Sequence, residues 1–295
     1  EGNRNDWLNS QFIAALGLTA VVFLTAFVVI ELVRREPFIN LRLLADRNFG
    51  LGTIVSTAFG VGMYGMMFLL PVYLAQVQGY NAQQIGQTIM WSGIPQVFMM
   101  PVAALLMRWF DARILLTLGL ALFGGSSLMN STMTNLTAYD QLILAQLVRA
   151  LGLPLVIVPL TSLTTGHIGP QQSGSASALY NMFRNLGGSI GIAVLATQLD
   201  LREKFHSVRL GEGINAFNPA ANERLESLAR QLMARGADAV TAGQQALGAV
   251  AGLVRREAYV MAYGDCFYLL SLLMFSMVLL VWLCRGVKGG SLAAH

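Results

Sequence analysis

The sequence predicts an all-α membrane protein whose helices cross the bilayer several times. Of the 295 residues, 55% are hydrophobic and only 12% are charged, whereas a soluble domain carries roughly a quarter of its residues as charges. The apolar residues gather in runs of about 20 or more, the length that a helix needs to cross the hydrocarbon core. Basic residues cluster in alternate connections between these runs, which is typical of a polytopic protein.

Seven runs are long and apolar enough to be read as spanning helices. In chain order they are Phe12–Val33, Phe49–Ala75, Ile85–Trp109, Arg113–Met133, Leu142–Leu163, Ser175–Leu199 and Val260–Cys284. We therefore expect four parts. Residues 1–48 hold the first helix and a cytoplasmic linker, residues 49–199 hold five helices, residues 200–257 form an outer loop, and residues 258–295 hold the last helix and a cytoplasmic tail.

The charges of the short connections predict the orientation of these helices. Basic residues follow the first run, join the third run to the fourth and follow the last: Arg34, Arg35, Arg42, Arg47, Arg108, Arg113, Arg285 and Lys288. The connections 76–84 and 134–139 hold no Lys or Arg. Short basic connections stay in the cytoplasm, so the chain should begin outside and end inside. An odd number of spans with an outside start predicts that further helices precede Glu1.

The connection Asp200–Glu257 carries many charges of both signs and should lie outside the membrane. Asn218 and Pro219 predict a helix start, with Asn as the cap and Pro in the first turn, and Gly236 predicts its end. A second helix, from about Asp238 to Arg255, is expected to continue into the last span. The connection is either a solvated linker or a docking surface for a partner.

Arg184 is the first candidate functional residue, because a charged group at bilayer depth is costly. It lies ~15 Å into its helix at 1.5 Å per residue, near the midplane. Asn181 and Asn185 share its helical face, and Tyr180 lies beside it. The guanidinium either lines a substrate cavity or bonds to the backbone of neighbouring helices.

Arg149 and Asp265 are weaker candidates. Arg149 lies about 10 Å from the outer end of its run, where it either has a buried partner in the cavity or extends toward the membrane surface. Asp265 is the carboxylate well inside a run, near the outer end of the last helix. It either carries protons during transport or stays hydrated at the interface.

The second and third runs are rich in Met, aromatic and Gln side chains. Met is adaptable and suits a promiscuous apolar site, although ordinary packing is the alternative for each residue. The members that we expect to line a cavity are Tyr64, Met67, Gln87, Trp91 and Gln96. Small residues and prolines that would let a bundle pack closely and rock are Gly187, Gly188, Gly191, Pro71 and Pro159.

Motifs for other chemistries are missing from the sequence. It holds no P-loop, no zinc-ligand motif and no nucleophile elbow. The three histidines, His167, His206 and His295, are predicted to be scattered in loops and the tail. We therefore expect no cofactor, no metal, no nucleic-acid partner and no enzymatic activity, which favours transport.

Several stretches together resemble one family. They are Pro37–Leu41 with Arg47–Phe49, Leu70–Gln76 with Gly79 and Tyr80, Ser175–Asn181 with Arg184 and Leu186–Gly191, and Phe217–Pro219 in the outer loop. These stretches resemble the fourteen-helix drug:proton antiporters of the major facilitator superfamily, and the outer loop resembles the EmrB-type exporters among them. The resemblance covers nearly the whole chain but only the second half of such a protein.

The resemblance implies a fold and a function. The fold is two six-helix bundles with two extra helices between them, so that Phe12–Val33 is the second extra helix and the other six form the C-terminal bundle. The implied activity is export of amphipathic drugs across the bacterial inner membrane in exchange for protons, together with a periplasmic adaptor and an outer-membrane channel. The main proton-carrying acid would belong to the N-terminal half. The connection Arg108–Arg113 is a degenerate form of the family's cytoplasmic motif, and Arg149 is displaced along its helix.

Two alternatives remain open at this point. The first is an exporter of a natural metabolite, such as a siderophore or a fatty acid, on the same fold. The second is a membrane scaffold subunit that acts through its outer loop.

Overall fold

The computed structural model describes residues 11–33, 40–137, 139–214 and 218–285. Every regular element within these residues is helical, which confirms the all-α class. In chain order the elements are α1 (Gln11–Val33), the 3-10 helix η3 (Leu41–Ala45), α2 (Arg47–Gln76), α3 (Ala82–Leu106), α4 (Ala112–Ser131), α5 (Tyr139–Thr165), α6 (Pro170–Glu212), α7 (Pro219–Ala234) and α8 (Ala239–Leu283).

Five of the described helices, α2, α3, α4, α5 and α8, are long and apolar enough to cross a membrane. The other two predicted spans do not meet that measure. In α6 the polar residues Asn181, Arg184 and Asn185 lower the hydropathy of the middle of the helix. In α1 the described residues include the apolar stretch Ala14–Phe23, and the predicted span Phe12–Val33 stays a prediction.

Side-chain caps set several helix starts. Asp46 Oδ1 accepts from the Phe49 N–H at 2.9 Å before α2, and Asn81 and Gln84 form a reciprocal capping box before α3. Such caps satisfy backbone N–H groups that the first helical turn leaves without partners. The predicted starts of these spans are therefore close to the observed ones.

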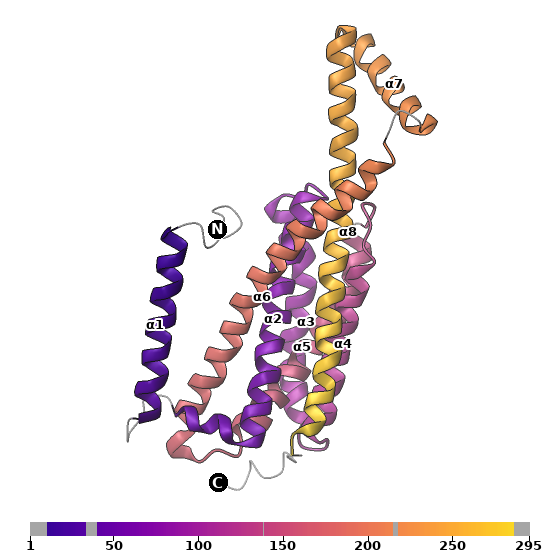
Figure 1. The fold of residues 1–295 in the computed structure, drawn as a ribbon. Coiled ribbons are helices and arrows are strands. Elements are labelled where there is room, and N and C mark those ends of the chain that lie inside the picture. Colours follow the sequence, from indigo (N-terminus) through magenta and orange to yellow (C-terminus); the bar gives the residue numbers. More distant parts are fainter. Residues whose placement is uncertain (1–10, 34–39, 138, 215–217, 286–295) are drawn as a thin grey trace.

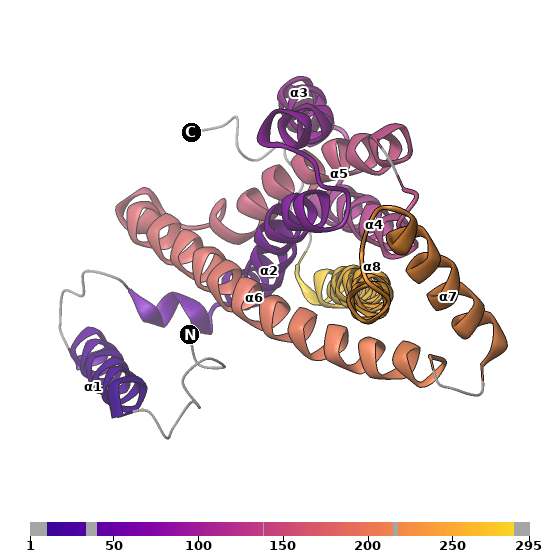
Figure 2. The same cartoon turned by 90° about the horizontal axis from the view of Figure 1, so that it is seen from above.

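The bundle is built around α2, which packs against α5, α6 and α8 (Figures 1 and 2). Between lipid-facing helices, dispersion packing and close contact replace the hydrophobic effect as the source of cohesion. Phe59 and Phe123 pack edge to face with ring centroids 5.5 Å apart, as do Tyr73 and Tyr263. Each such aromatic pair contributes about 0.5–1.5 kcal/mol beyond its buried area.

Glycines bring α2 and α6 into backbone contact. A Cβ added to Gly60 would lie 2.2 Å from the Arg184 carbonyl oxygen. A Cβ added to Gly187 would lie 2.1 Å from the Thr57 carbonyl oxygen. We call this contact the α2–α6 glycine seam, and its members are Gly60, Gly187, Gly188 and Gly191. Of the predicted packing residues, the three glycines therefore lie in one helix interface, whereas Pro71 and Pro159 lie inside α2 and α5.

The segment 200–257, expected to be a partly helical loop, includes an extension of α6 that was not predicted. α6 continues beyond Leu199 to Glu212, whereas α8 begins at Ala239, as expected for a helix that starts near Asp238 and continues into the last span. The outer extension, residues 200–214 and 218–257, thus consists of the ends of two long helices and α7, and it rises above the bundle (Figure 1). The sequence obscured the extension of α6, because charged residues follow the apolar part of that helix without any helix-breaking signal.

The local predictions inside the outer extension are confirmed. α7 begins at Pro219, and Gly236 adopts a φ of 98° after the helix ends. Asp238 caps α8 by accepting from the Val240 and Thr241 N–H groups at 3.1 Å, and α8 runs unbroken into the last span.

α1 stands apart from the bundle on the side of α6 (Figures 1 and 2). Its contact with the other described elements is with η3, and its described apolar side chains, such as Phe12 and Phe23, are exposed. An exposed apolar helix of this kind suits a lipid environment.

Candidate functional site

Four of the predicted cavity residues lie together on one face of α6. The Arg184 Nη2 donates to Asn181 Oδ1 at 2.6 Å, and the guanidinium carbon lies 5.6 Å from the centroid of the Tyr180 ring. This arrangement follows from the helix, because residues three and four apart are neighbours on its surface. Asn185 follows on the same side.

Neighbouring helices add to this face. The Tyr64 hydroxyl of α2 donates to Asn185 Oδ1 at 3.0 Å, and the Thr161 hydroxyl of α5 donates to the Tyr180 hydroxyl at 3.4 Å. We call the group the polar cluster, and its members are Tyr64, Thr161, Tyr180, Asn181, Arg184 and Asn185. Thr161 is a member that the sequence prediction missed, because its contact depends on how α5 packs against α6.

The charge of Arg184 is uncompensated within the described residues. It forms no ion pair there, and its buried Nε has no hydrogen-bond partner. An unsatisfied donor on a cation in a low-dielectric environment is costly. The polar cluster can therefore accept an anionic group or a strong hydrogen-bond acceptor.

Arg149 and Trp91 belong to a second site, between α3 and α5. Arg149 is 5% exposed and its Nη2 donates to Ser92 Oγ at 2.6 Å. The Trp91 indole N–H donates to the Tyr139 hydroxyl at 2.5 Å. Both amide atoms of the neighbouring Gln146 are buried without a hydrogen-bond partner. A buried partner for Arg149 was expected, and it is a serine hydroxyl.

The remaining cavity candidates are more exposed. Met67 is 62% exposed on α2, Gln87 is exposed and Gln96 is half-buried on α3. Most of the surface of α3 is uncovered in this structure. The ten predicted residues are therefore divided between the polar cluster, the Arg149 site and the open surface of α2 and α3, and their role in binding stays a prediction.

Asp265 lies where α6 and α8 leave the bundle. Its Oδ2 accepts from His206 Nε2 at 2.8 Å and forms an ion pair with Arg202, whose Nε lies 3.3 Å away. His206 is buried on α6, so the prediction that it lies in a loop is wrong. A nearby ion pair joins Arg255 of α8 to Glu203 of α6 at 3.6 Å. These five residues form the outer ion-pair cluster, which the sequence did not reveal because α6 is longer than predicted.

Asp46 and His167 form a corresponding pair at the opposite, inner end of the bundle. His167 Nε2 lies 2.8 Å from Asp46 Oδ1. Partial burial raises the pKa of the Asp46 carboxyl, but the Phe49 N–H and His167 outweigh burial and hold that pKa below its ordinary value. The pair fixes the connection between α5 and α6 to the start of α2.

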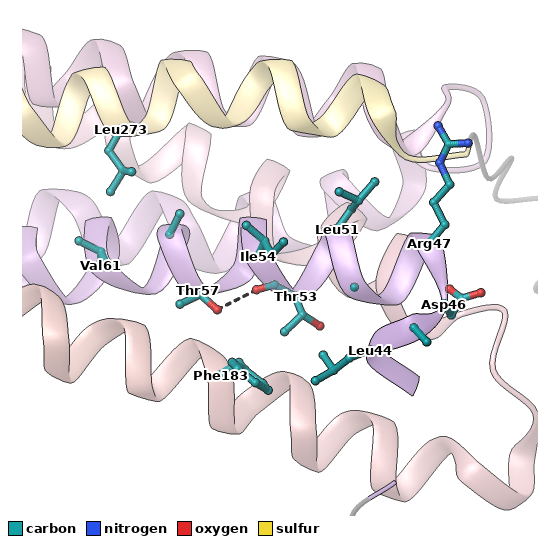
Figure 3. A pocket seen from close by; sticks show the side chains of 13 residues that line it. Leu44, Asp46, Arg47, Leu51, Thr53, Ile54, Thr57, Val61, Phe183 and Leu273 are labelled. Atoms are coloured by element: carbon teal, nitrogen blue, oxygen red, sulfur yellow. Dashed lines mark hydrogen bonds between the residues drawn. The ribbon is translucent and has the colours of Figure 1, made fainter. Parts of the chain in front are cut away.

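An apolar groove lies elsewhere. It has a volume of about 780 Å³ and is formed by η3, α2, α6 and α8 (Figure 3). None of the ten predicted cavity residues lines it, although Phe183, next to Arg184, does. The described residues contain no group of three or more His, Cys, Asp or Glu that could hold a metal ion.

Comparison with known proteins gives the family. The model of the Major Facilitator Superfamily matches residues 6–192, which is well over half of the chain. This chain belongs to the Major Facilitator Superfamily. It is accordingly a multi-pass membrane protein of the transporter class, as the apolar helices indicate.

Three curated proteins are similar to this chain over nearly its whole length. The chain is 28% identical over 98% of its length to the colistin resistance protein EmrB of Acinetobacter baumannii. It is 29% identical over 96% of its length to the fatty acid resistance protein FarB of Neisseria gonorrhoeae. It is 28% identical over its full length to the multidrug export protein EmrB of Escherichia coli. The chain spans 54–57% of the length of these three proteins.

Proposed function

We propose that this chain is the C-terminal part of a secondary exporter that moves amphipathic drugs or toxic compounds out of a bacterial cell in exchange for protons. Its family and the names of its relatives support drug export. The observation that carries the proposal is the polar cluster, in which Arg184 has no acidic partner within the described residues and keeps a buried Nε without an acceptor.

The chemistry of the polar cluster fits a substrate with an acceptor group beside an apolar body. Arg184 would hold the acceptor, and the amides of Asn181 and Asn185 would adjust to it. Met67, which is exposed on α2, offers apolar contact. The described members of the cluster include no carboxylate, so the main proton-carrying acid would lie in the N-terminal half.

The test is transport by the full-length protein in proteoliposomes with an imposed pH gradient. Arg184→Ala should lower uptake of a fluorescent anionic drug at least tenfold while the protein remains folded in the membrane, and Arg184→Lys should retain part of the activity. Arg209→Ala, on the same helix but in the outer extension, is the control. Uptake that does not respond to the gradient contradicts proton coupling, and loss of folded protein for Arg184→Ala assigns Arg184 to packing.

A natural metabolite is the second candidate for the cargo. The name of FarB refers to fatty acid resistance, and a fatty acid also combines an anionic group with an apolar body. Substrate profiling in a deletion strain separates the two candidates. Protection against structurally diverse drugs supports the first, and protection against one class of endogenous compound supports the second.

The proposed location is the bacterial inner membrane, with the outer extension in the periplasm and the end of α8 in the cytoplasm. In this arrangement the outer extension is the surface on which a periplasmic adaptor, and through it an outer-membrane channel, would dock. Apolar side chains there are solvent-exposed, including Val240 at 71% and Leu247 at 61%. Exposed apolar residues outside the membrane are typical of protein contact surfaces.

Leu247→Glu tests this docking surface. The variant should lose drug resistance in cells, because the charge would be buried on docking, but keep transport in proteoliposomes. Gln245→Glu places the same charge on another side of α8 and should behave as wild type. A scaffold function is supported instead if Leu247→Glu abolishes every activity and Arg184→Ala abolishes none.

A further inference from the structure

The groove in Figure 3 is separate from the polar cluster. α6 and α8 meet near the outer extension and diverge toward the inner end (Figure 1), which leaves one face of α2 uncovered between them. Its floor and walls are apolar and are built largely from Leu51, Ile54, Ala58, Val61, Phe183 and Leu273. Ile54 is 53% exposed there.

The α2–α6 glycine seam closes the groove off from the polar cluster. Thr57 lines the groove, and its carbonyl oxygen lies against Gly187. Val61 also lines the groove and packs against Gly191. Because backbone contacts fill the space between the two helices, a molecule in the groove does not reach Arg184. The groove is therefore not part of the proposed substrate site.

The inner mouth of the groove is cationic. Arg47 lies there, and its Nε donates to the Leu283 carbonyl oxygen at 3.0 Å, which fixes the side chain at the end of α8 (Figure 3). Arg42 lies nearby on η3. The acidic residue of the lining, Asp46, is paired with His167 at 2.8 Å.

An apolar groove with a fixed guanidinium at its membrane-surface end matches one class of molecule. We propose that it binds an anionic phospholipid, with an acyl chain along α2 and the phosphate at Arg47. Basic pockets between helices on the cytoplasmic side are suited to anionic headgroups, and arginine suits phosphate. The proposal uses the proposed orientation only to name the leaflet, and it holds whether or not the protein exports drugs.

Native mass spectrometry of the full-length protein tests the proposal. The protein is released from nanodiscs that contain equal amounts of phosphatidylglycerol and phosphatidylethanolamine with identical acyl chains. Wild type should retain phosphatidylglycerol preferentially. Arg47→Gln should reduce that retention about fivefold, the effect expected for one basic residue at the membrane surface. Arg108→Gln removes an exposed arginine from the α3–α4 connection at the same end and should change nothing.

Ala58→Phe is a second test variant. Its larger side chain should fill the groove, so neither phosphatidylglycerol nor phosphatidylethanolamine should be retained there. The proposal is wrong if wild type shows no headgroup preference or if Arg47→Gln retains as much phosphatidylglycerol as wild type, since both outcomes describe ordinary annular lipid. It is also wrong if a nitroxide at Ile54→Cys is shielded from molecular oxygen in nanodiscs, which would mean that another helix, such as α1, covers the groove. Transport is not a readout here, so these outcomes leave the exporter proposal untouched.

Discussion

At the scale of single residues, the charged side chains fall into two groups. Some form ion pairs with specific neighbours, and two arginines have no acidic partner within the described residues. Arg184 and Arg149 form no ion pair within the described residues, whereas Asp46 and Asp265 are each paired with a histidine. The sequence predicted the contact of Arg184 with Asn181 because it depends only on helical spacing. It did not predict the pairing of Asp265 with His206, because those residues meet only once two long helices cross.

Asp46 gives a residue-scale prediction about pH. Because the folded-state pKa of this carboxyl is below its ordinary value, its charge contributes stability above about pH 4, the ordinary value, and this contribution is lost as pH falls through the folded-state pKa. Asp46→Asn keeps the cap but loses the charge, so its thermal stability should fall below that of wild type at pH 7. It should approach that of wild type only near about pH 2, below the folded-state pKa.

Asp46→Ala separates the cap from the charge. It also removes the acceptor for the Phe49 N–H, which should cost about 1 kcal/mol at both pH values. Thermal unfolding of the full-length protein in detergent measures all three proteins. Equal stability of Asp46→Asn and wild type at both pH values would show that the His167 pair contributes nothing.

At the scale of elements, several helix boundaries follow local chemistry, but the end of α6 does not. The caps at Asn218 and Asp238 and the stop at Gly236 could be read from neighbouring residues. The continuation of α6 to Glu212 could not, because a charged amphipathic helix and a solvated linker have similar compositions. The groove was also beyond sequence reasoning, since it depends on the angle between α6 and α8.

The α2–α6 glycine seam gives an element-scale prediction. Gly187→Ala places a Cβ 2.1 Å from the Thr57 carbonyl oxygen, so the two helices must separate or distort. The expected cost is about 1–3 kcal/mol, seen as a lower unfolding temperature and weaker transport. Gly174→Ala is the matched control on the same helix, where an added Cβ meets nothing within 4 Å. A Gly187→Ala protein as stable as Gly174→Ala would contradict close contact at the seam.

At the scale of the whole molecule, the outer ion-pair cluster connects the outer extension to the bundle. Asp265 of α8 holds two α6 residues, Arg202 and His206, at the level where both helices leave the bundle. The family and the class of fold were predictable from motifs and hydropathy. The continuation of α8 from the outer extension into the bundle was also predicted. The continuation of α6 from the bundle into the outer extension was not.

Asp265→Asn tests which role this residue has. The Asp265 side chain is 34% exposed, and loss of its ion pairs should cost on the order of 1 kcal/mol each. The variant should therefore remain folded, while hydrogen exchange in residues 200–212 should accelerate because α6 is less firmly held. If Asp265 acts only in holding the two helices, the pH profile of transport stays that of wild type. A displaced profile with unchanged exchange would assign it to proton transfer instead.

The unbroken length of α8 has a mechanical consequence. Its 45 residues correspond to a rod of about 68 Å at 1.5 Å per residue. A tilt of about 10° at the inner end of such a rod displaces its far tip by roughly 12 Å. A modest rocking of the bundle would therefore reach the far tip of α8 as a large lever stroke, and whatever rests on that tip would sense the tilt of the helices.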